Sequence, residues 1–194
     1  MHTDAVALLE LRGVASGYAV LDTMTKHSPV QIIEANLVEP GHFLILYTGG
    51  VAEVEEAHNK AQEHHKQKII AQMLLPFAHV QILKALSGAE NLQTAEEYDC
   101  LGVVECKRIA DTLRVADAVL KNADVTLVGL RVATALGGKG YFVLSGLQHD
   151  VEIALDIVGN TLKPEDIVDR ELIPRPHVEA VEWLLRKAPF HVGR

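Results

Sequence analysis

The stretch "VLDTMTKHSPVQII" at residues 20–33 returns in altered form as "VADAVLKNADVTLV" at residues 115–128. Each version opens with apolar residues at helical spacing and closes with an apolar, β-rich run. Each also keeps an aspartate and a lysine four residues apart, Asp22 with Lys26 and Asp117 with Lys121. A match of this kind, offset by about 95 residues, indicates that the chain contains an internal duplication.

Three further blocks match in the same order. They are "LLEL" (8–11) with "VVEC" (103–106), "GHFLILYTGGVAEVE" (41–55) with "GKGYFVLSGLQHDVE" (138–152), and "LLPFAHV" (74–80) with "LIPRPHV" (172–178). A repeat of this size is a whole domain and not a unit of a solenoid. We therefore predict a first domain at residues 1–90, a linker at 91–99 within a polar, turn-rich stretch, and a second domain at 100–194.

Both copies predict the same order of elements. It comprises a strand (5–11; 101–107), a helix, a second strand (30–37; 125–132), a Gly-containing loop, a third strand (43–48; 140–145), a helix after Gly49 or Gly146, a short strand (69–75; 167–173) and a final helix (78–86; 177–187). The order βαββαβα predicts an α+β fold in which helices cover a mostly antiparallel sheet.

Composition excludes several classes of protein. The net charge of −8, with scattered Lys and Arg, argues against a nucleic-acid binder. No apolar stretch reaches the roughly 20 residues that span a bilayer, and Asp4 and Glu10 interrupt any signal-peptide core. We therefore expect a cytoplasmic protein with reduced thiols. The spacing of Cys100 and Cys106 fits neither a CxxC pair nor a zinc knuckle, so we expect two small buried residues.

No motif in the chain predicts an enzyme. "LGGKGY" (136–141) resembles a phosphate-binding loop, but Gly140 stands where the magnesium-binding hydroxyl residue belongs. "HNKAQEHHK" (58–66) is rich in histidine, yet none of its histidines has the i, i+4 spacing of a metal-binding helix. We interpret this segment as a solvated polar face. There is also no Ser-His-Asp elbow.

One short loop does combine an acid with an imidazole. "VEPGH" (38–42) lies between two apolar runs, and Pro40-Gly41 predicts a turn with Glu39 and His42 on either side. Solvent exposure at a hairpin tip is the simplest explanation of this pair. The alternative is that the loop has a function.

With both halves laid out, the chain resembles the shell-protein family of bacterial microcompartments. The resemblance covers nearly the whole chain, from about Asp4 to Trp183, in the unpermuted order of elements. It is carried by "ALLELRGVASGYAVLDTMTK" and "LGVVECKRIADTLRVADAVLK", by "EPGHFLILYTGGVAEVEEA" and "LGGKGYFVLSGLQHDVEIA", and by the closing "IPRPH". The pattern is most similar to the tandem-domain shell proteins of propanediol-utilisation compartments.

The resemblance implies a homotrimer whose six domains form a pseudohexameric tile. Such tiles pack edge to edge with other shell proteins and enclose enzymes, and small metabolites cross through a central pore. By this resemblance the pore is lined by Glu39, Pro40 and Gly41 from one domain and by Leu136, Gly137 and Gly138 from the other. Lys26, Lys121 and Arg175 would then lie at the outer edge of the tile and take part in assembly.

One position departs from the pattern of these relatives. They carry Cys immediately before the Pro-Gly of this loop, where three thiolates hold an iron–sulfur cluster, whereas this chain has Glu39. A carboxylate is a hard oxygen ligand and a poor substitute for a thiolate at such a centre. We therefore expect no iron–sulfur cluster and no other cofactor.

Three functions remain open at this point. The first is a structural shell tile with a selective pore, which is not an enzyme and binds neither nucleic acid nor membrane. The second is a metal- or redox-carrying pore protein that uses Glu39 and His42 as ligands on the three-fold axis. The third is a trimeric ligand-binding or signalling protein of similar α+β type, because a fold alone does not fix a function.

Overall fold

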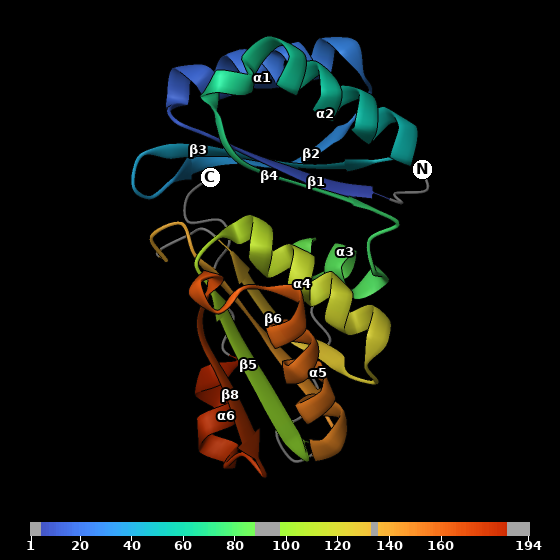
Figure 1. The fold of residues 1–194 in the computed structure, drawn as a ribbon, viewed down its shortest axis with the longest axis vertical. Coiled ribbons are helices and arrows are strands. Elements are labelled where there is room, and N and C mark those ends of the chain that lie inside the picture. The colour runs from blue at the N-terminus through green and yellow to red at the C-terminus, as the bar shows by residue number, and fades with distance from the viewer. Residues whose placement is uncertain (1–4, 88–97, 133–135, 186–194) are drawn as a thin grey trace. The chain divides into compact units, whose positions relative to one another are not determined.

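The computed structural model describes residues 5–87, 98–132 and 136–185 (Figure 1). The chain divides into two compact units, Met1–Ala78 and His79–Arg194. Each unit contains a four-stranded antiparallel sheet with two long helices. The predicted linker at 91–99 falls almost entirely outside the described residues. No helix among the described residues has the length and apolar character needed to cross a membrane.

The first unit follows the predicted order of elements up to its fourth strand. Its elements are β1 (Ala5–Leu11), α1 (Val14–His27), β2 (Gln31–Val38), β3 (His42–Gly49), α2 (Val51–His65), a 3-10 turn (Lys66–Lys68) and β4 (Ile69–Pro76). The strands lie in the order β2-β3-β1-β4. The two edges of this sheet are therefore β2 and β4.

The second unit repeats this arrangement and adds two short helices. It contains α3 (Val80–Leu86), β5 (Cys100–Cys106), α4 (Ile109–Asn122), β6 (Thr126–Val132), β7 (Gly140–Gly146), α5 (Gln148–Thr161), β8 (Ile167–Pro174) and α6 (Val178–Leu184). Its strand order, β6-β7-β5-β8, is that of the first sheet. The α+β fold class and the duplication are confirmed.

The division between the units differs from the domain boundary that the repeat predicts. Helix α3 ends the first repeat in sequence, yet it is grouped with the second unit and lies against β6 and α4. The reason is local, because two hydrogen bonds tie the start of this helix to the second repeat.

Alternation along the strands sorts the side chains of the first sheet onto its two faces. The residues of β1 that face the helices, Ala5, Ala7, Leu9 and Leu11, form one core with residues of α1 and α2. Gly17 brings α1 very close to β3, since a Cβ atom there would lie 2.2 Å from Cδ1 of Phe43. A larger residue at this position would force the helix away from the sheet.

The second sheet is covered on both faces. Gly102 of β5 lies under α5, where an added Cβ would meet Cγ1 of Val151 at 2.7 Å. On the opposite face Leu101, Val128 and Val143 pack together with Val181 of α6. Two-sided covering explains why the strands of this sheet have apolar residues at consecutive positions and do not alternate strictly.

The histidine-rich helix departs from the sequence interpretation at one residue. Glu63 and His64 are exposed as predicted, but His58 is buried on the inner side of α2. Its Nδ1 lies 2.7 Å from the hydroxyl oxygen of the buried Tyr47. The interpretation of residues 58–66 as a solvated face was therefore wrong for His58. Residues three and four apart lie on the same face of a helix, so position 58 shares the buried face with Val54 and Ala61.

We predict that His58 makes folding stability depend on pH. Burial lowers the pKa of this imidazole, so the folded state resists a proton that the unfolded chain accepts near pH 6.5. The contribution of the neutral His58 to the free energy of unfolding is fully present above that pH. It is lost as the pH falls, by at most about 1.4 kcal/mol per pH unit. Urea denaturation at pH 7.5 and 5.5, at one protein concentration, should show a smaller acid-side loss for His58→Gln than for the wild type. Equal losses would contradict this assignment.

Candidate pore loops and edge residues

The loop "VEPGH" forms a tight turn between β2 and β3. The N–H of Gly41 donates to the carbonyl of Val38 at 3.0 Å, and Gly41 has φ of +98°, which strongly favours glycine. The Glu39–Pro40 peptide bond is cis. Glu39, Pro40 and Gly41 are all exposed at the tip of this turn.

The second repeat builds a matching turn before β7. The N–H of Lys139 donates to the carbonyl of Leu136 at 3.2 Å, and both Gly137 and Gly138 have positive φ, +62° and +80°. This conformation explains the two consecutive glycines, which side chains would strain. Each unit thus presents a short turn at the same place in the fold, between its edge strand and the next strand.

An ion pair at the base of each turn was not predicted from the sequence. Nδ1 of His42 lies 2.7 Å from Oε1 of Glu10, and Nζ of Lys139 lies 3.1 Å from Oε1 of Glu105. Glu10 and Glu105 are the matching third residues of "LLEL" and "VVEC", and His42 and Lys139 each follow the glycine of the turn. Aligning the two repeats shows that all four residues occupy matching positions. The sequence does not show that they are in contact, because the partners in each pair are more than thirty positions apart.

His42 therefore contacts Glu10 on the face of the sheet opposite α1 and α2. Its neighbours Phe43, Ile45 and Tyr47 belong to the helix-covered core, so alternation directs position 42 to the other face. Among the described residues, no group of three or more His, Cys, Asp or Glu side chains is arranged to hold a metal ion. A metal site built from Glu39 and His42 of three chains stays a prediction.

The predicted edge lysines form the same contact in two different environments. Nζ of Lys26 lies 2.6 Å from Oδ2 of Asp22, and Nζ of Lys121 lies 2.6 Å from Oδ2 of Asp117. The Asp22 side chain is 60% exposed, whereas that of Asp117 is only 7% exposed. Both lysines are exposed, as a role at an outer edge requires.

Arg175, the third predicted edge residue, lies in the turn after β8. Its side chain is exposed, its φ is +47°, and its N–H donates to the carbonyl of Asp99 at 2.8 Å. Phe77, at the matching position of the first repeat, has φ of +56°. The Pro-x-x-His segments therefore share an unusual backbone conformation, while the role of Arg175 at an edge stays a prediction.

Both thiols are buried, as the sequence analysis expects. Cys100 and Cys106 lie at the two ends of β5, and burial raises the pKa of each, that of Cys106 to about 11. A thiol with a raised pKa is largely protonated at neutral pH and is a weak metal ligand and nucleophile. The absence of an iron–sulfur cluster stays a prediction.

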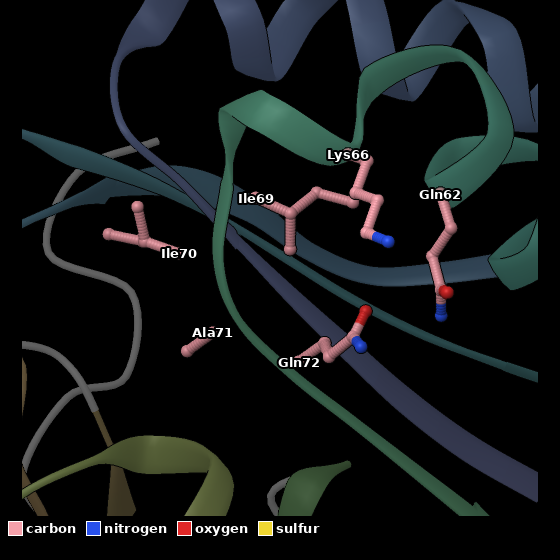
Figure 2. A pocket seen from close by; sticks show the side chains of 6 residues that line it. All are labelled: Gln62, Lys66, Ile69, Ile70, Ala71 and Gln72. Carbon is pink, nitrogen blue, oxygen red and sulfur yellow. The ribbon is translucent and has the colours of Figure 1, made fainter.

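A shallow hollow of about 220 Å³ opens beside the start of β4. It is lined by Gln62, Lys66, Ile69, Ile70, Ala71 and Gln72 (Figure 2). Lys66 is its one titratable side chain, and the other lining residues are amides, alkyl groups and backbone. This lining lacks the acid–base pair or activated nucleophile that hydrolytic and group-transfer enzymes use.

Comparison with known proteins agrees with this geometry. The family model described as the BMC domain matches the chain twice, at residues 5–78 and 100–176. The chain therefore belongs to the BMC-domain family of bacterial microcompartment shell proteins, in the class that carries two such domains in tandem.

Individual relatives support the same assignment. The bacterial microcompartment shell protein PduT of Citrobacter freundii is 31% identical over 176 residues, which is 90% of this chain and 94% of that protein. A solved microcompartment protein from Desulfitobacterium hafniense DCB matches with a TM-score of 0.82 at 30% identity, over 91% of this chain and 97% of that one. A double-ringed trimeric shell protein of the RMM microcompartment shares the fold, with a TM-score of 0.59 at 17% identity over 82% and 83% of the two chains. The expectation of a tandem-domain shell protein is confirmed.

We predict that the ion pairs at the base of the turns stabilise the fold. His42→Ala leaves the nearly buried Glu10 carboxylate without its imidazole hydrogen-bond partner and should lower the free energy of unfolding by about 1–3 kcal/mol. His42→Lys copies Lys139 of the second repeat and should cost clearly less. Urea denaturation of both variants, with the exposed His149→Ala as a control, measures the difference. If His42→Ala and His149→Ala behave alike, the pair contributes nothing.

Proposed function

We propose that this shell protein is a homotrimer in which six domains surround one central pore for small metabolites. In this arrangement the pore is lined by Glu39, Pro40, Gly41, Leu136, Gly137 and Gly138. The observation that carries this proposal is that both repeats place a tight turn at the same position. Glu39, Pro40 and Gly41 are exposed in the first turn and Gly137 is exposed in the second, and a glutamate side chain contacts the base of each turn. Turns that are held rigidly suit the narrowest part of a pore, because their tips keep a constant position.

The two kinds of turn would give the pore a mixed character. Three Glu39 carboxylates near one axis attract cations and repel anions, as acidic rings do in channels. The second turn adds no charge at Gly137 and Gly138, and the backbone of Gly138, which has no side chain, can hydrogen-bond an uncharged or anionic metabolite. The pore would therefore select by charge and by hydrogen bonding together.

We propose further that the protein is not an enzyme and carries no iron–sulfur cluster. Glu39 occupies the position of the cluster-binding cysteine in relatives, and both cysteines of this chain are buried with raised pKa values. The residues present therefore do not fit such a cluster. The charge of −8 supports a surface that meets other shell proteins and not nucleic acid.

Assembly can be tested at two levels. Native mass spectrometry should give three times the chain mass of 21.2 kDa, and electron microscopy of concentrated protein should show sheets or tubes. The double variant Lys26→Ala/Lys121→Ala should lose the sheets and keep the trimer. The exposed Lys26–Asp22 pair contributes only about 0.3–0.5 kcal/mol to stability, and the buried Asp117 keeps the N–H of His79 as a donor when Lys121 is truncated. Lys60→Ala, on the exposed face of α2, is the matched control and should keep the sheets.

A monomer in native mass spectrometry would contradict the proposed trimer. Sheets that persist in the double lysine variant would contradict the edge assignment alone.

The pore assignment predicts a change in ion preference. Glu39→Gln removes three carboxylates from the proposed ring and should reduce the preference for cations over anions when the trimer is inserted into a planar bilayer. The reversal potential in a salt gradient measures this preference directly. Glu55→Gln, which makes the same charge change on exposed α2, should leave it unchanged. An unaltered reversal potential for Glu39→Gln would mean that Glu39 does not line the pore.

A further inference from the structure

The segment that follows β4 shows how the end of one repeat binds the side of the next. The N–H of His79 donates to Oδ1 of Asp117 at 2.7 Å, and the side-chain oxygen of Gln81 accepts from the N–H of Leu127 at 2.7 Å. Asp117 belongs to α4, and Leu127 belongs to the edge strand β6. Helix α3 then lies against β6 and α4 with Ile82 and Leu86 buried.

This contact explains why the two aspartates differ in exposure. Asp117 accepts from His79 and from Lys121 at once and is almost fully buried. Asp22, at the matching position of the first repeat, contacts Lys26 and keeps a side chain that is 60% exposed. The first repeat therefore has the same carboxylate acceptor, Asp22, but there the carboxylate is exposed.

The matching donor groups stand at the end of the second repeat. His177 matches His79 and Glu179 matches Gln81, and both His177 and Glu179 are exposed. Ala180 and Leu184 match the buried Ile82 and Leu86, yet they too are exposed. Among the described residues of one chain this contact therefore forms once, between His79 and Asp117. The matching groups, His177 at the end of the second repeat and Asp22 in the first, are both exposed.

The edge strands also agree in local shape. The pairing of β2 with β3 shifts register between Ile32 and Glu34, and the pairing of β6 with β7 shifts between Leu127 and Gly129. Ile32 is the residue that matches Leu127. A partner that fits the bulged edge of β6 therefore meets the same backbone shape at β2.

We propose that a second copy of this chain completes the open contact: its His177 N–H donates to Asp22, and its Glu179 carboxylate accepts from the N–H of Ile32. The proposal rests on the proposed function, because it specifies the interface between chains of the trimer. A head-to-tail contact of this kind closes into a ring when the rotation allows it. Each chain then supplies one internal and one intermolecular copy of the same contact, and three chains give six.

The contact would also organise the tile edge. In the trimer Asp22 would be buried and would position Lys26 in the way that the buried Asp117 positions Lys121. Both lysines of each chain would then be paired with an aspartate that a Pro-x-x-His segment holds in place. Glu179 replaces the neutral Gln81, and a carboxylate accepts a stronger hydrogen bond than an amide oxygen does.

Covalent crosslinking tests the contact directly. In Asp22→Cys/His177→Cys, a short thiol-to-thiol crosslinker should join chains to each other and give covalent dimers and trimers on a denaturing gel. The backbone N–H of position 177 is retained in this variant, and both native cysteines are buried with raised pKa values, so they react slowly. The single variants Asp22→Cys and His177→Cys are the controls and should give neither product in quantity.

An aspartate substitution provides a second, independent readout. Asp22→Ala should weaken association of the trimer by roughly tenfold or more per contact, as expected for the loss of a charge-assisted hydrogen bond. Asp156→Ala, which removes the same charge from an exposed position on α5, should leave association unchanged. Native mass spectrometry over a dilution series measures both.

The outcomes separate the interface from the function. Trimers that show no crosslink between chains, and whose association is unaffected by Asp22→Ala, would overturn this interface while the proposed trimer stands. A protein that forms no trimer at any concentration would overturn the proposed function and this contact with it.

Discussion

The structure depends on one constraint, which is that an open sheet has two edges whose hydrogen-bonding groups need a partner. The strand order leaves β2 and β4 at the edges of the first sheet and β6 and β8 at those of the second. In the second unit helix α3 lies along the β6 edge, where its Gln81 accepts from the N–H of Leu127. Because the domain is duplicated, helix α3 from the end of the first repeat can cover one such edge within the same chain. The equivalent β2 edge is the one that the proposed neighbouring chain would cover.

Much of this architecture could be predicted from the sequence. The duplicated blocks fixed the number of strands, their order along the chain and the positions of both turns, because apolar periodicity and turn glycines are local signals. The pairs Glu10–His42 and Glu105–Lys139 were not predicted, although each partner had already been aligned with its counterpart. Strand pairing brings these residues together, and a single copy of the sequence does not show which strands are neighbours.

His58 and helix α3 show two other limits of the sequence. Helical periodicity places His58 on the buried face of α2, but it does not show that the hydroxyl of Tyr47, from a different element, is the hydrogen-bond partner of the imidazole. Helix α3 ends the first repeat in sequence but joins the second unit in space, because its contacts are with residues from the following domain. In both cases the deciding interaction is with a distant residue. Local sequence patterns predicted the helices and strands correctly, but they did not predict which distant residues those helices contact.

In the proposed trimer, two similar domains per chain place six turns around one axis. A single-particle electron-microscopy map of the assembled protein would show this arrangement. We expect three chains in head-to-tail contact, with the turns at residues 39–41 and 136–138 alternating around a central opening and Lys26 and Lys121 on the rim. A two-fold assembly, or a ring in which these turns face outwards, would contradict it.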